Sequence, residues 1–109
     1  MSRILLNKMS NDWFLGAPFN MAQYALLTHL MAHSVNMLPG ELVYTVGDAH
    51  LYLNHVEQAK EQLSRPQSVE KAQLQVLGQN RADPKDYEFA DLQLSNYHPL
   101  GKIAAPIAV

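Results

Sequence analysis

Cysteine is absent from this 109-residue sequence. Its absence excludes disulfide bonds, thiolate metal sites and a cysteine nucleophile within these residues. Charge is also sparse, because charged residues make up 17% of the chain and the net charge is -2. The lysines and arginines are scattered, so no basic stripe indicates nucleic acid and no cationic amphipathic helix indicates a membrane surface.

Long hydrophobic runs are missing as well. The first ten residues, MSRILLNKMS, contain no apolar run of the length that a signal peptide needs. The longest apolar segment is interrupted by Thr28, His29, His33 and Ser34, which argues against a membrane span. Together with the lack of cysteine, this pattern fits a cytoplasmic protein.

Apolar residues nevertheless make up 48% of the chain, which favours a globular fold over disorder. The length predicts one domain covering residues 1–109. A folded chain of this size is expected to bury roughly two thirds of the surface that its unfolded form exposes.

A long helix is the clearest predicted element. Helical spacing of apolar residues runs from Phe19 to about Asn36, after a short strand at Ile4–Leu6 and a loop over residues 11–18. Pro39-Gly40 follows the predicted helix end. The helix is apolar nearly all round, so it needs more cover than the rest of the chain supplies. We therefore expect a partner chain or further sequence to pack against it.

The remaining residues predict strands, a second helix and turns. A strand is expected at Glu41–Val46, broken or bulged at Gly47-Asp48, with extended structure resuming at Ala49–Leu53. Asn54 is expected to cap a helix at His55–Ser64. The other predicted elements are a linker, a strand, a turn, a second strand and an extended tail, at residues 66–70, 72–77, 83–86, 92–94 and 97–109. The fold class is α+β, with a long buried helix packed on a mostly antiparallel or mixed sheet.

The junction between the first strand and the long helix, Ser10–Tyr24, combines polar and turn-forming residues with apolar neighbours. Asp12 is followed by the Gly16 and Pro18 turn and by Asn20 at the mouth of the helix. The commoner interpretation is structural, with Asp12 forming a turn and Asn20 capping the helix. The alternative is a ligand site, because an amide offers a donor and an acceptor together, as a pyrimidine edge requires.

Two pairs of ring-bearing residues are further candidates. His50 and Tyr52 lie on one face of a strand and could hydrogen-bond a sugar hydroxyl, or could be ordinary residues of a half-buried strand. His29 and His33 have a metal-ligand spacing on a helix, but Leu30 stands where the zinc motif needs a glutamate. We therefore interpret His29 and His33 as structural and expect no metal.

Several motifs together carry a resemblance to a known family. They follow one another as NDWFLGAPFNMAQYALLTHLMAH, PGELVYTVGDAHLYLNH, EQLSRP and AAPIAV. In order and spacing they resemble the C-terminal part of thymidylate synthase. The resemblance implies a thymidylate-synthase-like fold and the reductive methylation of dUMP to dTMP, with methylenetetrahydrofolate as co-substrate. It also implies dUMP and folate as ligands, and a homodimer or a missing N-terminal segment as partner.

The resemblance further implies a role for particular residues. Ser10 would help to bind the phosphate, Asn20 would read the pyrimidine edge, and Asp12 would contact both folate and nucleotide. Gly16 would let the ligands approach the backbone. The full set implied for dUMP is Ser10, Asn11, Asp12, Asn20, His50 and Tyr52. The set implied for folate is Asp12, Gly16, Ala108 and Val109, the last two in a tail that closes over the folate.

Two departures from the family pattern limit this interpretation. Met9 stands where the family has a phosphate-binding arginine, and methionine cannot make a bidentate charge-assisted contact. The family's nucleophilic cysteine has no counterpart here, so no catalytic residue is assigned in this chain. Two alternatives therefore stay open: a non-catalytic remnant or module for dimerisation or binding, and a pyrimidine hydroxymethylase relative. Asn20 argues against the cytosine-specific form of the latter.

Overall fold

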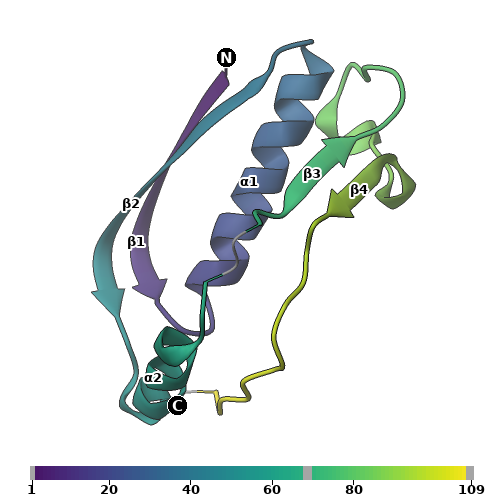
Figure 1. The fold of residues 1–109 in the computed structure, drawn as a ribbon. Helices are drawn as coiled ribbons and strands as arrows, with labels where there is room; N and C mark the ends of the chain where they lie inside the picture. The colour runs from purple at the N-terminus through teal and green to yellow at the C-terminus, as the bar shows by residue number, and fades with distance from the viewer. Residues whose placement is uncertain (1, 68–69, 108–109) are drawn as a thin grey trace.

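A computed structural model describes residues 2–67 and 70–107 (Figure 1). Its main elements are β1 (Ser2–Asp12), α1 (Ala17–Ser34), β2 (Pro39–His50) and α2 (Val56–Ser64), followed by β3 (Gln73–Val76) and β4 (Leu92–Ser95). Short 3₁₀ turns occur at Leu53–His55 (η1), Pro84–Asp86 (η2) and Phe89–Asp91 (η3). Helices and strands are mixed, which confirms the α+β fold class.

The strands β1 and β2 pair in parallel, with α1 as the crossover between them. Both strands are longer than the sequence predicts. The predicted loop at residues 11–18 is wrong at its start, because β1 continues to Asp12. The predicted break at Gly47-Asp48 is also wrong, because Ser10 pairs with Asp48 in an uninterrupted β2. A Cβ on Gly47 would lie 3.3 Å from the carbonyl oxygen of Met9, so this glycine permits close strand approach.

The helix α1 begins two residues earlier than predicted and ends in a Schellman motif. Asn36 adopts a left-handed conformation with φ of 57°. Its backbone N–H donates to the carbonyl of His33, and that of Met37 donates to the carbonyl of Ala32. The residue that precedes the helix is Gly16, so the prediction that Asn20 caps the helix is wrong.

The second helix also starts without the predicted cap. Asn54 lies inside the 3₁₀ turn η1, and His55 is the residue at the N-terminus of α2. Salt bridges of 3.4 Å from Lys60 to Glu57 and of 3.7 Å from Arg65 to Glu61 lie along its outer face. Extended structure was predicted up to Leu53, but Leu53–His55 forms a compact 3₁₀ turn. The helix therefore starts at Val56, one residue later than predicted.

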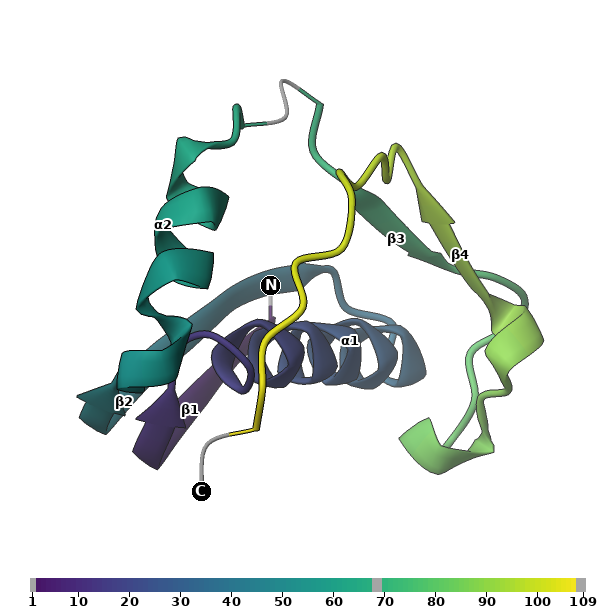
Figure 2. The ribbon, with the colours of Figure 1, turned by 90° about the horizontal axis from the view of Figure 1, so that it is seen from below.

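The two sheets lie on opposite sides of α1, as Figure 2 shows. The antiparallel pair β3–β4, with Leu74 opposite Leu94, packs on one side, and the β1–β2 pair packs on the other. The described part of the tail is extended, as predicted, and returns toward α2. The tail therefore brings residues after 96 back to the elements that precede β3.

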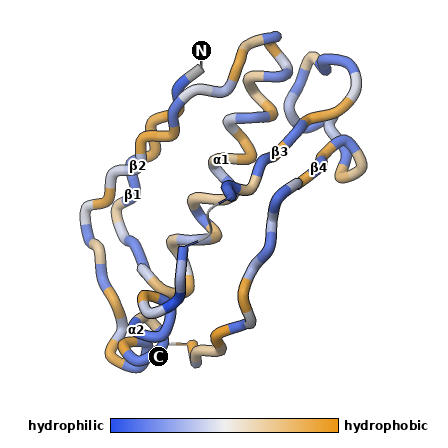
Figure 3. The backbone as a smooth tube through the Cα atoms, viewed as in Figure 1, coloured by the Kyte–Doolittle hydropathy of each residue, from blue (hydrophilic) through white to orange (hydrophobic). Residues whose placement is uncertain are grey.

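The interior of the chain is small. Among the described residues, Ala17 and Ala32 are the only apolar side chains that are fully enclosed. Figure 3 shows hydrophobic positions along α1 and along both strands of the parallel pair. The accessible surface of 8431 Å² means that folding buries only about half of the unfolded surface. The expectation of two thirds is wrong, because no large apolar side chain is sealed between the layers.

Candidate functional site

The carboxyl ends of β1 and β2 meet next to the start of α1. Asp12 is the cross-strand neighbour of His50, although 38 positions separate them in the chain. The backbone N–H of Trp13 donates to the carbonyl of His50 at 2.9 Å and fixes this junction. Ligands of sheets with parallel strands bind outside the carboxyl ends of the strands. The structure thus brings Asp12 and His50 to a position that suits a binding site.

Asp12 shapes the turn that leads into the helix. Its Oδ1 accepts a hydrogen bond of 3.3 Å from the backbone N–H of Phe14, and its carbonyl accepts one of 3.2 Å from Gly16. These contacts confirm the turn-forming role predicted for Asp12. A Cβ on Gly16 would lie 3.1 Å from the carbonyl oxygen of Asp12 and 3.6 Å from Oδ1 of Asn20. A side chain at position 16 would therefore crowd the turn where it packs against the helix.

Asn20 lies in the first turn of α1 and faces β1. Its Oδ1 accepts a hydrogen bond from Nζ of Lys8, which also lies 3.5 Å from Oδ1 of Asn11. Sequence reasoning missed Lys8. In β1, half-buried Ile4, Leu6 and Lys8 alternate with exposed residues, a pattern that the sequence ILLNKM does not reveal. Lys8 places a positive charge between the strand and the helix.

Asn11 is fully buried beside this lysine. Its Oδ1 accepts a hydrogen bond of 2.5 Å from the hydroxyl of Tyr44, while its Nδ2 has no partner among the described residues. A buried amide nitrogen without an acceptor costs about 1–3 kcal/mol. The neighbouring Ser10 and Met9 are exposed, with Met9 at 89%. A ligand phosphate at these two residues would therefore lie at the solvent edge of the site.

β2 ends at His50, so the prediction that Tyr52 lies on the same strand is wrong, but the two rings are in contact. Their ring centroids are 5.0 Å apart in an edge-to-face arrangement. Nδ1 of His50 lies 3.2 Å from the carbonyl oxygen of Asp48, which can only accept, so Nδ1 carries the hydrogen. In the neutral tautomer with its hydrogen on Nδ1, Nε2 is an acceptor. The pair can consequently accept from a hydroxyl through His50 and donate to it or accept from it through Tyr52.

His55 is a second residue that sequence reasoning missed. It is fully buried, with its ring centroid 5.6 Å from that of Phe14 and 5.8 Å from that of Tyr52. Nε2 donates a 2.5 Å hydrogen bond to the carbonyl of Pro106, while Nδ1 has no partner among the described residues. His55 thus ties the tail to the site. Ala108 and Val109, assigned to the folate side, lie outside the described residues.

The two histidines of α1, His29 and His33, belong to no metal-binding cluster among the described residues. Nδ1 of His33 lies 2.5 Å from the hydroxyl of Tyr87 in the loop between β3 and β4. The described residues contain no group of three or more His, Cys, Asp or Glu arranged to hold a metal ion. His33 therefore has a defined hydrogen-bond partner, Tyr87, in keeping with its structural interpretation.

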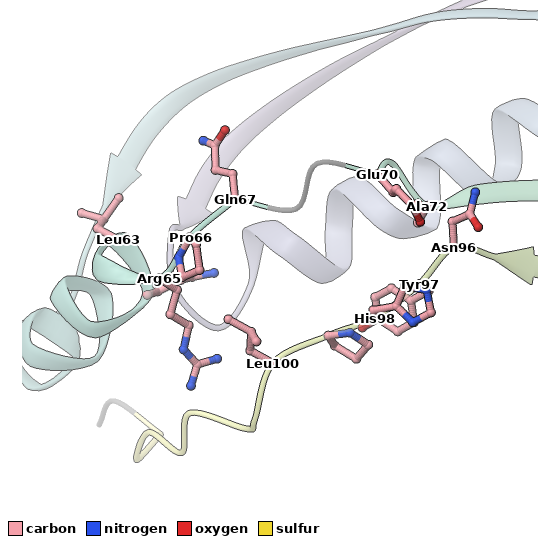
Figure 4. A pocket seen from close by; sticks show the side chains of 12 residues that line it. Leu63, Arg65, Pro66, Gln67, Glu70, Ala72, Asn96, Tyr97, His98 and Leu100 are labelled. Carbon is pink, nitrogen blue, oxygen red and sulfur yellow. The ribbon is translucent and has the colours of Figure 1, made fainter.

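A cavity of about 660 Å³ lies beside the end of α2 (Figure 4). It opens between the end of α2, near Arg65, and the tail near Tyr97 and Leu100. None of the predicted ligand residues lines it. We therefore place the candidate site at the pairing of Asp12 with His50, beside Tyr52, and not in this cavity.

Comparisons with known proteins identify the family of the chain. The family model of thymidylate synthase matches residues 3–109. Thymidylate synthases of Listeria monocytogenes serovar 1/2a and Listeria innocua serovar 6a are each 52% identical over 105 residues, which is 95% of this chain. The matched part is 32% of each relative, at its C-terminal end, so the chain spans about a third of their length. In the part of the chain that the structure describes, no helix has the length and apolarity to span a membrane. On the match to almost all of its residues, the chain belongs to the thymidylate synthase family.

Proposed function

We propose that this chain supplies the C-terminal part of a site that binds dUMP and methylenetetrahydrofolate for the reductive methylation of dUMP to dTMP. The observation that carries the proposal is the cross-strand pairing of Asp12 with His50, with Asn20 in the adjoining helix turn. Three residue types that suit a nucleotide are thereby gathered from distant parts of the sequence.

The proposed roles follow from the hydrogen-bonding capacity of each group. His50 and Tyr52 would hold the deoxyribose hydroxyl, because Nε2 of His50 is an acceptor and the Tyr52 phenol can donate. Asn20 would read the pyrimidine edge once its Oδ1 is released by Lys8. Asn11 would line the nucleotide side, since its Nδ2 is a buried donor with no partner in residues 2–67 and 70–107. Ser10 would bind the phosphate from the exposed end of β1.

The folate side of the proposal rests on Asp12, Gly16, Ala108 and Val109. The Asp12 carboxylate is an acceptor suited to the N–H groups of a pterin ring, and Gly16 leaves no side chain in the way. The co-substrate would supply both the transferred carbon and the reducing hydride. The described residues would bind and orient it.

The nucleophile in this proposal comes from outside these residues. Methylation by this family requires a thiolate to attack the pyrimidine ring, and the sequence contains no cysteine. We accordingly propose a methyltransferase role only together with a polypeptide that carries the cysteine. A homodimer and a cytoplasmic location belong to the same proposal.

The phosphate contact offers a direct test of the proposal. Met9→Arg should tighten dUMP binding by tenfold or more, because a hydrogen bond to a charged group contributes about 1.5–3 kcal/mol. Calorimetry would measure dUMP affinity in both proteins. Leu5→Arg is the matched control, since Leu5 is 67% exposed on the same strand and lies farther from the site. Equal affinity in the Met9→Arg variant and the native chain would refute the assignment.

A second candidate is a non-catalytic module for binding or assembly, favoured by the missing cysteine and by Met9. Such a module would self-associate without binding nucleotide. Thermal melts with dUMP and an antifolate separate the two functions. A ligand-induced rise in melting temperature supports the nucleotide site, whereas self-association with no rise supports the module.

A further inference from the structure

Lys8 lies between the side chains of two asparagines at the candidate site. Its Nζ donates a hydrogen bond to Oδ1 of Asn20 and lies 3.5 Å from Oδ1 of Asn11. An ammonium group has three donors and no acceptor, so the amide atom that faces it must be the oxygen. Lys8 therefore fixes which end of each amide faces it.

No other described group fixes the amide of Asn20. In residues 2–67 and 70–107, its side chain has no hydrogen bond besides the one from Lys8. The backbone N–H of Asn20 donates to the carbonyl of Gly16 at 3.0 Å, which holds the helix and not the side chain. The terminal torsion of an asparagine is broad and roughly two-fold, so its amide can turn end for end where nothing opposes it. The orientation of this amide consequently depends on Lys8.

Orientation matters because the two pyrimidine bases present opposite patterns to an amide. Uracil offers an acceptor, O4, beside a donor, N3–H, whereas cytosine offers a donor, its N4 amino group, beside an acceptor, N3. An amide that is free to turn can pair with either base through two hydrogen bonds. An amide held in one orientation can pair fully with only one of them. The group that holds the amide thus decides how well the site separates the two bases.

We propose that Lys8 is the positioning residue through which Asn20 distinguishes uracil from cytosine. The inference rests on the proposed function, in which Asn20 reads the pyrimidine edge. When N3–H of the base takes Oδ1 of Asn20, the ammonium is retained by Oδ1 of Asn11, its second acceptor. From there it opposes the turned amide, because Nδ2 of Asn20 and the ammonium would then face each other as two donors.

The surroundings of Lys8 strengthen this effect. Lys8 and Asn20 are half-buried and Asn11 is fully buried, so little water is available to screen the ammonium or to satisfy a misplaced donor. The hydroxyl of Tyr44 also donates to Oδ1 of Asn11, at 2.5 Å. The second acceptor of Lys8 is therefore held in place from the neighbouring strand β2.

Calorimetry with dUMP and dCMP measures the effect as the ratio of the two affinities in each protein. The sugar and the phosphate are the same in both ligands, so their contributions cancel. The native chain should prefer dUMP at least about tenfold, the factor expected for one mismatched hydrogen bond at a buried site. Lys8→Met should bring the two affinities within about threefold of each other, because the amide is then free to turn. Lys8→Arg should keep the native preference, because a guanidinium group is also a donor without an acceptor.

Arg3→Met is the matched control for the lost charge. Arg3 lies near the start of β1 and pairs with Glu41 at 3.0 Å, with 64% of its side chain exposed. Loss of this exposed pair should leave the ratio within about twofold of its native value. Lys8→Leu repeats the test with a second apolar side chain if Lys8→Met does not fold.

A purely structural Lys8 would change both affinities by the same factor. A dUMP preference that Lys8→Met or Lys8→Leu leaves unchanged therefore overturns the inference, and so does a native chain that binds the two nucleotides equally. In both cases the binding of dUMP itself leaves the proposed function standing. Binding of neither nucleotide overturns the inference and the proposed function together.

Discussion

The hydrogen bond from His55 to the tail predicts a specific change in how the tail is held. His55 is fully buried, and its Nε2 donates to the carbonyl of Pro106 at 2.5 Å. A second anchor lies earlier in the tail, where Nη1 of Arg65 donates to the carbonyl of Gly101 at 2.6 Å. Lys102 lies between the two anchors. His55→Leu removes one anchor and fills the same space with an apolar side chain.

The size of the effect follows from the geometry. A neutral hydrogen bond contributes about 0.5–1.5 kcal/mol net, which corresponds to about a 2- to 12-fold change in the ratio of closed to open tail. Pro106 is exposed, so its carbonyl can be hydrated when the tail opens. Nδ1 of His55 has no partner among the described residues, so leucine also removes a buried polar atom. We therefore expect the tail to open while the melting temperature changes little.

Limited trypsin digestion measures this opening. Cleavage after Lys102 should be about 2- to 12-fold faster in His55→Leu. Cleavage after Lys71, which lies between α2 and β3, should stay unchanged and serves as an internal control. His55→Gln should restore slow cleavage, because its Nε2 amide can donate at a similar reach. Equal cleavage after Lys102 in the native and His55→Leu chains would refute the reasoning. Fast cleavage in His55→Gln would show that packing, and not the hydrogen bond, holds the tail.

Three further predictions concern the junction between strand and helix. Lys8→Met should lower the free energy of unfolding by about 1.5 kcal/mol in urea titrations, because the charged contact to Asn20 is lost. Tyr44→Phe should lower it by about 1 kcal/mol, since the Asn11 carbonyl loses its closest donor, and an unchanged midpoint would contradict this. Gly16→Ala should weaken dUMP binding in calorimetry and change the melting temperature little, because its Cβ crowds the turn that positions the site.

Local signals predicted the order and type of most elements. The helix end, predicted near Asn36 and found at Ser34, the strand predicted at 72–77 and the turn predicted at 83–86 depend on residues within a few positions of one another. Strand lengths failed for the opposite reason. β1 continues through Ser10–Asp12, and β2 through Gly47-Asp48, because pairing with a distant strand supplies hydrogen bonds that local propensity does not reveal.

The candidate site divides in the same way. The motifs around Asp12, Asn20 and His50 could be read from the sequence, and their roles toward dUMP and folate stay predictions. Lys8 and His55 could not be assigned, because their partners are 12 and 51 positions away in the chain. Nothing in the local pattern of either residue shows which distant group it contacts.

The sequence by itself determined which chemistry is absent and which family the chain belongs to. Without cysteine no thiolate can form, and motif order identifies the family whatever the packing. Only the tertiary structure decided that Asp12 meets His50, that the tail is held by His55, and that an apolar cavity lies between α1 and the β3–β4 pair. Such contacts depend on how a parallel pair, its crossover helix and the tail close loops of many residues, which neighbouring side chains do not encode.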